Sequence, residues 1–283
     1  MRFEKWQALG NDYLIVEAAA LPWELTEARV RRLCDPHFGP GSDGVLLLAP
    51  VEDPTHVAEL RIFNPDGSEA ELSGNGAREA VLYLRRSGWT DADTFSILTK
   101  AGPISPTIVS ERECTLEMGA AATTSPDYPS GAADGRGELE AAGRTWSFQH
   151  VSIGNPQCAI EVPAAAELEA LDLPAIGPEI ESHELFPNRT NVSFYRSDGE
   201  GRVRARIFER GVGETLSSGT GASGAAVAAF LGGLGTPITV ELDGGELEVE
   251  VTEELGVKLT GWAEPVYAGE LSAELLRALQ AAG

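Results

Sequence analysis

The sequence has few basic residues, few cysteines and no long apolar run. Its 283 residues include 21 Lys and Arg against 44 Asp and Glu, a net charge of −23. A surface of this sign repels phosphate backbones and anionic lipid, so we expect neither nucleic acid nor membrane as a partner. No stretch approaches the ~18 apolar residues that cross a bilayer, and the N-terminus lacks the apolar segment of a secretory signal. A small zwitterion could still bind in a local site.

The three cysteines exclude several kinds of site. Cys34, Cys114 and Cys158 are odd in number and far apart, which matches neither a metal site nor a disulfide framework in a chain of this length. The sequence also contains no P-loop, no HExxH helix and no paired CxxC. We therefore expect reduced, buried thiols, a cytoplasmic location and no bound metal.

Two stretches of the chain have nearly the same sequence. Residues 61–77 read RIFNPDGSEAELSGNGA, and residues 206–222 read RIFERGVGETLSSGTGA. Ser73-Gly74 recurs 145 residues later as Ser218-Gly219, and Gly10-Asn11 recurs 144 residues later as Gly154-Asn155. So long a period fits the duplication and fusion of one domain of ~140 residues, not a solenoid of short repeats.

Both halves mix strand and helix signals. Short apolar runs broken by turn residues indicate strands. The spacing of apolar residues predicts a helix over 75–86, and its counterpart over 219–233, GTGASGAAVAAFLGG, is small and apolar on every side, as in a buried helix. Residues 119–143 are rich in Gly, Ala, Ser and Pro, so part of this segment should be a loop or linker.

The predicted fold class is therefore α+β, with two pseudo-symmetric domains. Each should be a curved, mainly antiparallel sheet around a central helix. We expect an N-terminal half over 1–120 and a C-terminal half over 121–267, with the active-site cleft between them. The segment 268–283, which contains an amphipathic helix pattern, is expected to pack on the N-terminal half.

Each Gly-x-Gly turn opens a predicted helix directly after a serine. First-turn amides lack intrahelical partners and the helix dipole favours negative charge there, so each half offers a site for a carboxylate or phosphate. The bland alternative is that the turns only cap helices, which two copies in corresponding positions make weaker. The match of GTGASG to a dinucleotide motif is formal, because no strand runs directly into its first glycine.

Five segments resemble, in order, the signature blocks of the diaminopimelate epimerase family. They read ALGNDYLIVE, NPDGSEAELSGNGAR, VSIGNPQC, FPNRTNV and ERGVGETLSSGTGAS, and they span residues 8–223. The resemblance implies a cofactor-independent isomerase that converts L,L- to meso-diaminopimelate in lysine and peptidoglycan biosynthesis. Two cysteines then act on opposite faces of the α-carbon, one removing a proton and the other delivering one. A homodimer is also implied, because Tyr267 lies in a block that resembles the family's dimer contact.

The resemblance also implies which residues form the site. The two catalytic cysteines of the family fall on Ser73 and Ser218, with Glu209 supporting the second, and a supporting histidine falls on Gln157. The implied substrate-binding positions are Asn11, Asn64, Gly74, Asn75, Asn155, Asn191, Glu209, Arg210, Gly219 and Thr220.

The two serines leave the chemistry open, because a serine hydroxyl is a far weaker acid than a thiol. The pair could be an engineered replacement that traps substrate, although Gln157 argues against this. It could belong to a natural branch that works through serines, water and Glu209, or that catalyses another isomerisation or a dehydration. It could also mark a binding protein without catalysis. An amino diacid is the expected ligand in all three cases.

Overall fold

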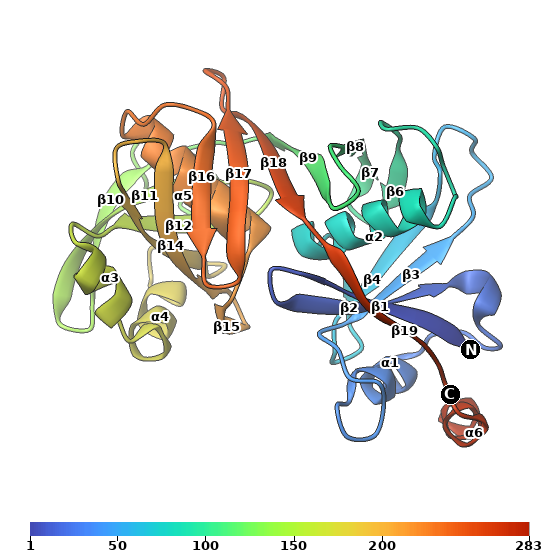
Figure 1. The fold of residues 1–283 in the computed structure, drawn as a ribbon. Helices are drawn as coiled ribbons and strands as arrows, with labels where there is room; N and C mark the ends of the chain where they lie inside the picture. The colour runs from blue at the N-terminus through green and yellow to red at the C-terminus, as the bar shows by residue number, and fades with distance from the viewer. Residues whose placement is uncertain (283) are drawn as a thin grey trace. The chain divides into compact units, whose positions relative to one another are not determined.

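A computed structural model describes residues 1–282 (Figure 1). The chain forms two compact units: unit 1 contains Met1–Leu116 and the chain from Gly261 onward, and unit 2 contains Glu117–Thr260. The two boundaries fall within strands β9 (Glu113–Ala120) and β18 (Gly256–Trp262). Gly283, the last residue of the segment 268–283, lies outside the described residues.

One sheet belongs to unit 1. It has eight strands in the order β19-β1-β2-β3-β4-β6-β7, with β5 paired to β4. The pairs β2–β3 and β4–β6 are parallel and the others antiparallel, so the sheet is mixed. Its strands are β1 (Arg2–Ala8), β2 (Asn11–Glu17), β3 (Val45–Ala49), β4 (Glu59–Phe63), β5 (Glu69–Ala70), β6 (Ile97–Thr99), β7 (Gly102–Ile104) and β19 (Glu264–Glu270).

The second sheet has eleven strands in the order β10-β11-β12-β13-β14-β16-β17-β18-β9-β8, with β15 paired to β14. It is also mixed, because β12–β13 and β14–β16 are parallel. Within the segment 119–143, residues 121–135 form irregular chain and the rest is largely strand. The remaining strands are β8 (Thr107–Ile108), β10 (Arg136–Ala141), β11 (Arg144–Ser152), β12 (Pro156–Glu161), β13 (Asn191–Ser197), β14 (Arg202–Glu209), β15 (Gly213–Thr215), β16 (Ile238–Leu242) and β17 (Gly245–Val251).

The two helices predicted after the serines are present, and both are buried. In α2 (Gly74–Arg86) the predicted apolar face is fully buried, and Gly88, at a φ of +75°, follows the C-cap Ser87. In α5 (Gly219–Leu231) the small residues are buried on every side, as predicted. The other described helices are the 3₁₀ turn η1 (Ala18–Ala20), α1 (Glu27–Cys34), α3 (Ala165–Ala170), α4 (Leu173–Glu181) and α6 (Ala273–Ala281).

Glycine lets α5 lie close to the strands that surround it (Figure 1). A Cβ on Gly221 would come within 2.9 Å of Ile207 Cγ2, and a Cβ on Gly224 within 2.8 Å of Gln157 Cβ. Real Cβ atoms do not approach other atoms so closely, and packed interiors have no slack to absorb the difference. The glycine spacing therefore fixes the depth of the helix and, with it, the position of its first turn.

Apolar packing also ties the C-terminal helix to unit 1. Leu271 and Leu279 are buried in the cluster that contains Phe3, Val30 and Leu33, and Leu275 and Leu276 pack against it, as the amphipathic pattern predicts. The three cysteines are free and buried. No helix within residues 1–282 is long and apolar enough to cross a membrane.

The tight packing of α5 predicts a large penalty for added volume. Ala225→Leu, at a fully buried position, should destabilise the protein by about 1–3 kcal/mol, because overpacking forces side chains and backbone out of their minima. Ala278→Leu on the exposed face of α6 is the matched control, with an effect within about 0.5 kcal/mol. Urea unfolding followed by circular dichroism measures both. Equal midpoints for the two variants would contradict the close packing of α5.

Candidate active site

In unit 1, Ser73 caps the N-terminus of α2. Its backbone is extended, with φ −132° and ψ 123°, and its Oγ accepts a hydrogen bond of 3.1 Å from the backbone N–H of Gly76. This is the ordinary N-cap arrangement. The first turn of the helix, with Gly74 and Asn75, therefore begins directly beside the serine hydroxyl. The dipole of α2 and these first-turn amides together favour an anion beside Ser73.

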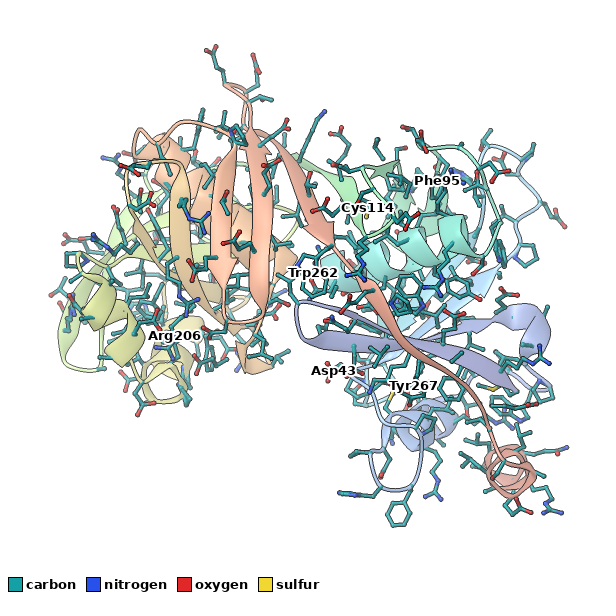
Figure 2. All side chains as sticks on the ribbon, viewed as in Figure 1. Asp43, Phe95, Cys114, Arg206, Trp262 and Tyr267 are labelled. Atoms are coloured by element: carbon teal, nitrogen blue, oxygen red, sulfur yellow. The ribbon has the colours of Figure 1, made fainter. Side chains whose placement is uncertain are left out.

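A row of amide side chains extends from this helix end. Arg78 donates to Asn75 Oδ1 at 2.6 Å, Asn75 Nδ2 donates to Asn11 Oδ1 at 3.2 Å, and Asn11 Nδ2 donates to Asp43 Oδ2 at 3.0 Å. Asp43 precedes β3 and is labelled in Figure 2. The structure therefore joins Asn11 and Asn75 directly, whereas the Asn64 side chain is hydrogen-bonded within its own turn after β4.

Tyr13 is a neighbour of Ser73 that was not expected from the sequence. Its hydroxyl donates to Ser73 Oγ at 3.2 Å, and its ring is buried. Tyr13 lies two residues after Asn11 on β2, and residues with this spacing share one face of a strand. That alternation, applied to the segment ALGNDYLIVE, was the only signal for it in the sequence.

Carboxyl groups are concentrated near the residues around Ser73, which together form the half-site of unit 1. Burial raises the pKa of Glu79 well above its ordinary value. Burial also raises the pKa of Asp12, and the charge of Asp43 adds to this, although Lys5, with its Nζ 3.1 Å from Asp12 Oδ1, opposes the shift. Glu79 is thereby held neutral over a wider pH range than an exposed glutamate, which limits the negative charge near the helix end.

In unit 2, Ser218 caps α5 in the same way. Its backbone has φ −145° and ψ 121°, and its Oγ accepts from the N–H of Gly221 at 3.2 Å. Its hydroxyl also donates to Glu209 Oε2 at 3.0 Å. Burial raises the pKa of Glu209, while the hydroxyls of Thr215 and Ser218 oppose the shift. The result is a hydroxyl–carboxylate pair at a helix N-terminus.

The two expected site asparagines of unit 2, Asn155 and Asn191, lie in different places. Asn155 Nδ2 donates to Thr220 Oγ1 at 3.2 Å, and Asn155 Oδ1 accepts from Gln157 Nε2 at 2.7 Å. Asn155 therefore contacts the first turn of α5, as Asn11 contacts that of α2. Gln157 is fully buried and positions Asn155 without being hydrogen-bonded to Ser218.

Asn191, in contrast, lies against Arg210, the residue after Glu209. Asn191 Nδ2 donates to Pro156 O at 3.0 Å, and its Oδ1 accepts from the backbone N–H of Arg210 at 2.9 Å. The Arg210 side chain is exposed and donates to Asn188 O at 3.0 Å. Asn191 thus braces the turn after Glu209, and Arg210 offers a cation beside it.

Hydroxyl, amide and carboxylate groups, with helix amides, make up both half-sites. These groups suit the carboxylate and ammonium of an amino acid. Among residues 1–282, no group of three or more His, Cys, Asp or Glu is arranged to hold a metal ion. A cavity of about 750 Å³ in unit 1, lined by Trp6, Arg85 and Arg112 among others, contains none of the expected site residues.

Comparison with known proteins identifies the family. The diaminopimelate epimerase family model matches residues 3–124 and 149–265. Diaminopimelate epimerase 1 of Nostoc sp. is 38% identical over 96% of this chain and 99% of its own length. The diaminopimelate epimerase of Pelotomaculum thermopropionicum is 39% identical over 95% of this chain and 98% of its own.

Solved structures support the same fold at lower identity. A phenazine biosynthesis protein of Bacillus anthracis has a TM-score of 0.69 at 20% identity and covers 96% of this chain and 99% of its own. A predicted epimerase of Pseudomonas aeruginosa has a TM-score of 0.67 at 18% identity, covering 95% and 98%. The match of the family model to both halves, with relatives at 38–39% identity along nearly the whole chain, shows that this protein belongs to the diaminopimelate epimerase family.

Proposed function

We propose that this protein is a cofactor-independent diaminopimelate epimerase, which inverts one α-carbon of L,L-diaminopimelate to give the meso isomer for lysine and peptidoglycan biosynthesis. The observation that carries the proposal is the pair of serine-capped helix N-termini, one of which is hydrogen-bonded to Glu209. Membership of the family along the whole chain supports it. The free thiols suit a reducing compartment, and we place the protein in the cytoplasm.

The two half-sites are proposed to act on one substrate, from opposite faces of its α-carbon. The first-turn amides at Gly74, Asn75, Gly219 and Thr220 would hold the α-carboxylate, where negative charge grows as the proton leaves. Such preorganised donors are worth most where charge develops, because they need no reorganisation during the reaction. The exposed guanidinium of Arg210 is proposed to bind the distal carboxylate of the diacid.

Ser73 and Ser218 are proposed to stand at the positions of the two family cysteines and to transfer the protons. A serine hydroxyl becomes basic enough only when another group accepts its proton as it reacts. Glu209 is within hydrogen-bonding distance of Ser218 for this purpose. Its raised pKa makes it a stronger base than an exposed glutamate, closer to what general-base catalysis near neutral pH requires.

Isotope exchange tests this function. With L,L-diaminopimelate in D₂O, we expect deuterium at the α-carbon together with the meso isomer, and Ser73→Ala or Ser218→Ala should each lower inversion about 100-fold or more. Ser272→Ala is the matched control, because Ser272 also caps a helix, α6, but at an exposed position. Mass spectrometry and chiral chromatography measure both products. Ligand binding without any exchange would instead favour a binding protein.

The acid limb of the pH profile should report Glu209. Only its carboxylate form accepts a proton, so kcat/KM should rise as the pH rises through its pKa, which lies above the ordinary value of a glutamate. Glu209→Gln should remove this limb and lower kcat/KM about 100-fold or more. Glu214→Gln, in the adjacent strand β15, should keep the limb. An unchanged limb in Glu209→Gln would exclude Glu209 as the base.

A homodimer is proposed through the edge of the unit 1 sheet. Strand β19 lies at one end of the strand order, and Val266 and Tyr267 on it are 54% and 42% exposed. Figure 2 labels Tyr267 on this strand. An edge strand with exposed apolar side chains is a template for pairing with a second chain.

Acidic side chains at this edge should separate the proposed dimer. Val266→Asp combined with Tyr267→Asp should shift the protein to a monomer, because two like charges would face their copies across a symmetric interface. Phe38→Asp, at a position 63% exposed in the same unit, should leave the dimer intact. Analytical ultracentrifugation measures the mass. A monomeric unsubstituted protein, or a dimer that survives the double substitution, would exclude this interface.

A further inference from the structure

The two serine hydroxyls differ in how their hydrogen-bonding capacity is used. A serine oxygen carries one proton to donate and two lone pairs that accept. Ser73 Oγ accepts twice, from Tyr13 at 3.2 Å and from the N–H of Gly76 at 3.1 Å. Ser218 Oγ accepts once, from Gly221 at 3.2 Å, and donates its proton to Glu209 at 3.0 Å.

The hydrogen-bonding capacity that remains on each serine oxygen indicates whether that serine donates or accepts a proton in the reaction. Both lone pairs of Ser73 are engaged, so the proton remains for a ligand. The proton of Ser218 is engaged, so a lone pair remains. We infer that Ser73 is the proton donor and Ser218 the proton acceptor of the resting protein, and that Tyr13 is the positioning residue that sets Ser73 as a donor and replaces its proton. This inference rests on the proposed function.

The duplication explains how the two halves came to differ. Glu209 corresponds to Asn64 at the repeat separation of 145, and Gln157 corresponds to Tyr13 at the separation of 144. Unit 1 therefore has a phenol where unit 2 has an amide, and unit 2 has a carboxylate where unit 1 has an amide. Each serine has its proton-transfer partner at a different position of the same repeated framework.

Close packing holds the phenol of Tyr13 against Ser73. The ring lies over Gly44, where an added Cβ would come within 2.5 Å of Tyr13 Cε1. The backbone of Tyr13 belongs to β2, which pairs with β1 and β3. The ring thus has little freedom to leave Ser73, and a phenol is a stronger acid than an alcohol, so it is suited to replace the serine proton.

The proton balance of one inversion follows directly. The Cα–H bond breaks as its proton passes to Ser218 Oγ, whose own proton passes to the Glu209 carboxylate. The electron pair left on Cα is delocalised into the α-carboxylate and then forms the new C–H bond with the Ser73 proton, while Ser73 takes the phenol proton of Tyr13. Glu209 ends as the acid and Tyr13 as the phenolate, and exchange with water restores both. The opposite inversion uses the same steps in reverse, starting from the phenolate and the acid.

Tyr13→Phe keeps the ring and removes the proton. For the isomer whose α-proton faces Ser218, removal continues and the proton returns on the same face, so deuterium enters with retention. For the other isomer, Ser73 can no longer remove the α-proton, because no phenolate is present to accept the serine's own proton. In D₂O, inversion of both isomers should fall about 10- to 100-fold, while the ratio of exchange to inversion rises at least about 10-fold for one isomer alone.

Two comparisons separate this role from a structural one. Tyr83→Phe removes another buried phenol from unit 1, one that donates to Glu17 at 2.8 Å, and should change neither rate nor ratio. In a Ser73→Cys background, adding Tyr13→Phe should cost less than about 3-fold, because a thiol is acidic enough to give its own proton.

The outcomes are distinct. An equal loss of exchange and inversion from both isomers in Tyr13→Phe, or no change, overturns the inference while the proposed function stands. It is also overturned if Tyr13→Phe costs as much in the Ser73→Cys background as in the unsubstituted protein. An unsubstituted protein that neither exchanges nor inverts either isomer refutes the proposed function and this inference together.

Discussion

The hydrogen bond from a helix amide to a serine Oγ is the interaction on which both half-sites depend. Gly76 donates to Ser73 and Gly221 donates to Ser218. Each bond starts a helix at a defined residue, and it also fixes the rotamer of the side chain proposed to transfer a proton. Binding and chemistry are therefore joined at one atom in each unit. A residue without a side-chain acceptor at either position would release the helix end and remove the reacting group together.

The surroundings of the caps explain why so much of the two helices is buried. A capping residue fixes the orientation of a helix end only if packing also holds the rest of the helix in place. In unit 2 the glycines and alanines of α5 let the strands approach closely, and in unit 1 the apolar face of α2 packs on β1, β2 and β3. The small residues after the first turn of α5 are thus part of the site, although none of them touches a ligand in the proposed mechanism.

The sequence predicts this framework well because the information is local or repeated. The repeat identifies both helices, the Gly-x-Gly turns predict where both begin, and the composition of 219–233 predicts a helix buried on every side. The contact of Tyr13 with Ser73 was not predicted, because it joins residues 60 apart and depends on how β2 packs against α2. The complete burial of Glu79 was missed for a similar reason, since helix periodicity does not reveal what covers a polar face.

The amide rows beside the caps also have a direction. In unit 1 every donor points the same way, from the buried guanidinium of Arg78 through Asn75 and Asn11 to the carboxylate of Asp43. In unit 2 the row starts on a strand at Gln157 and ends on the helix at Thr220. Each row polarises its members, and one amide cannot flip without breaking its neighbours' bonds. The hydrogen-bond rows of the two repeated halves thus run in opposite directions from donor to acceptor. The row in unit 1 runs from helix to loop, and the row in unit 2 runs from strand to helix. A duplicated fold can in this way present two unlike electrical environments at corresponding positions of its two halves.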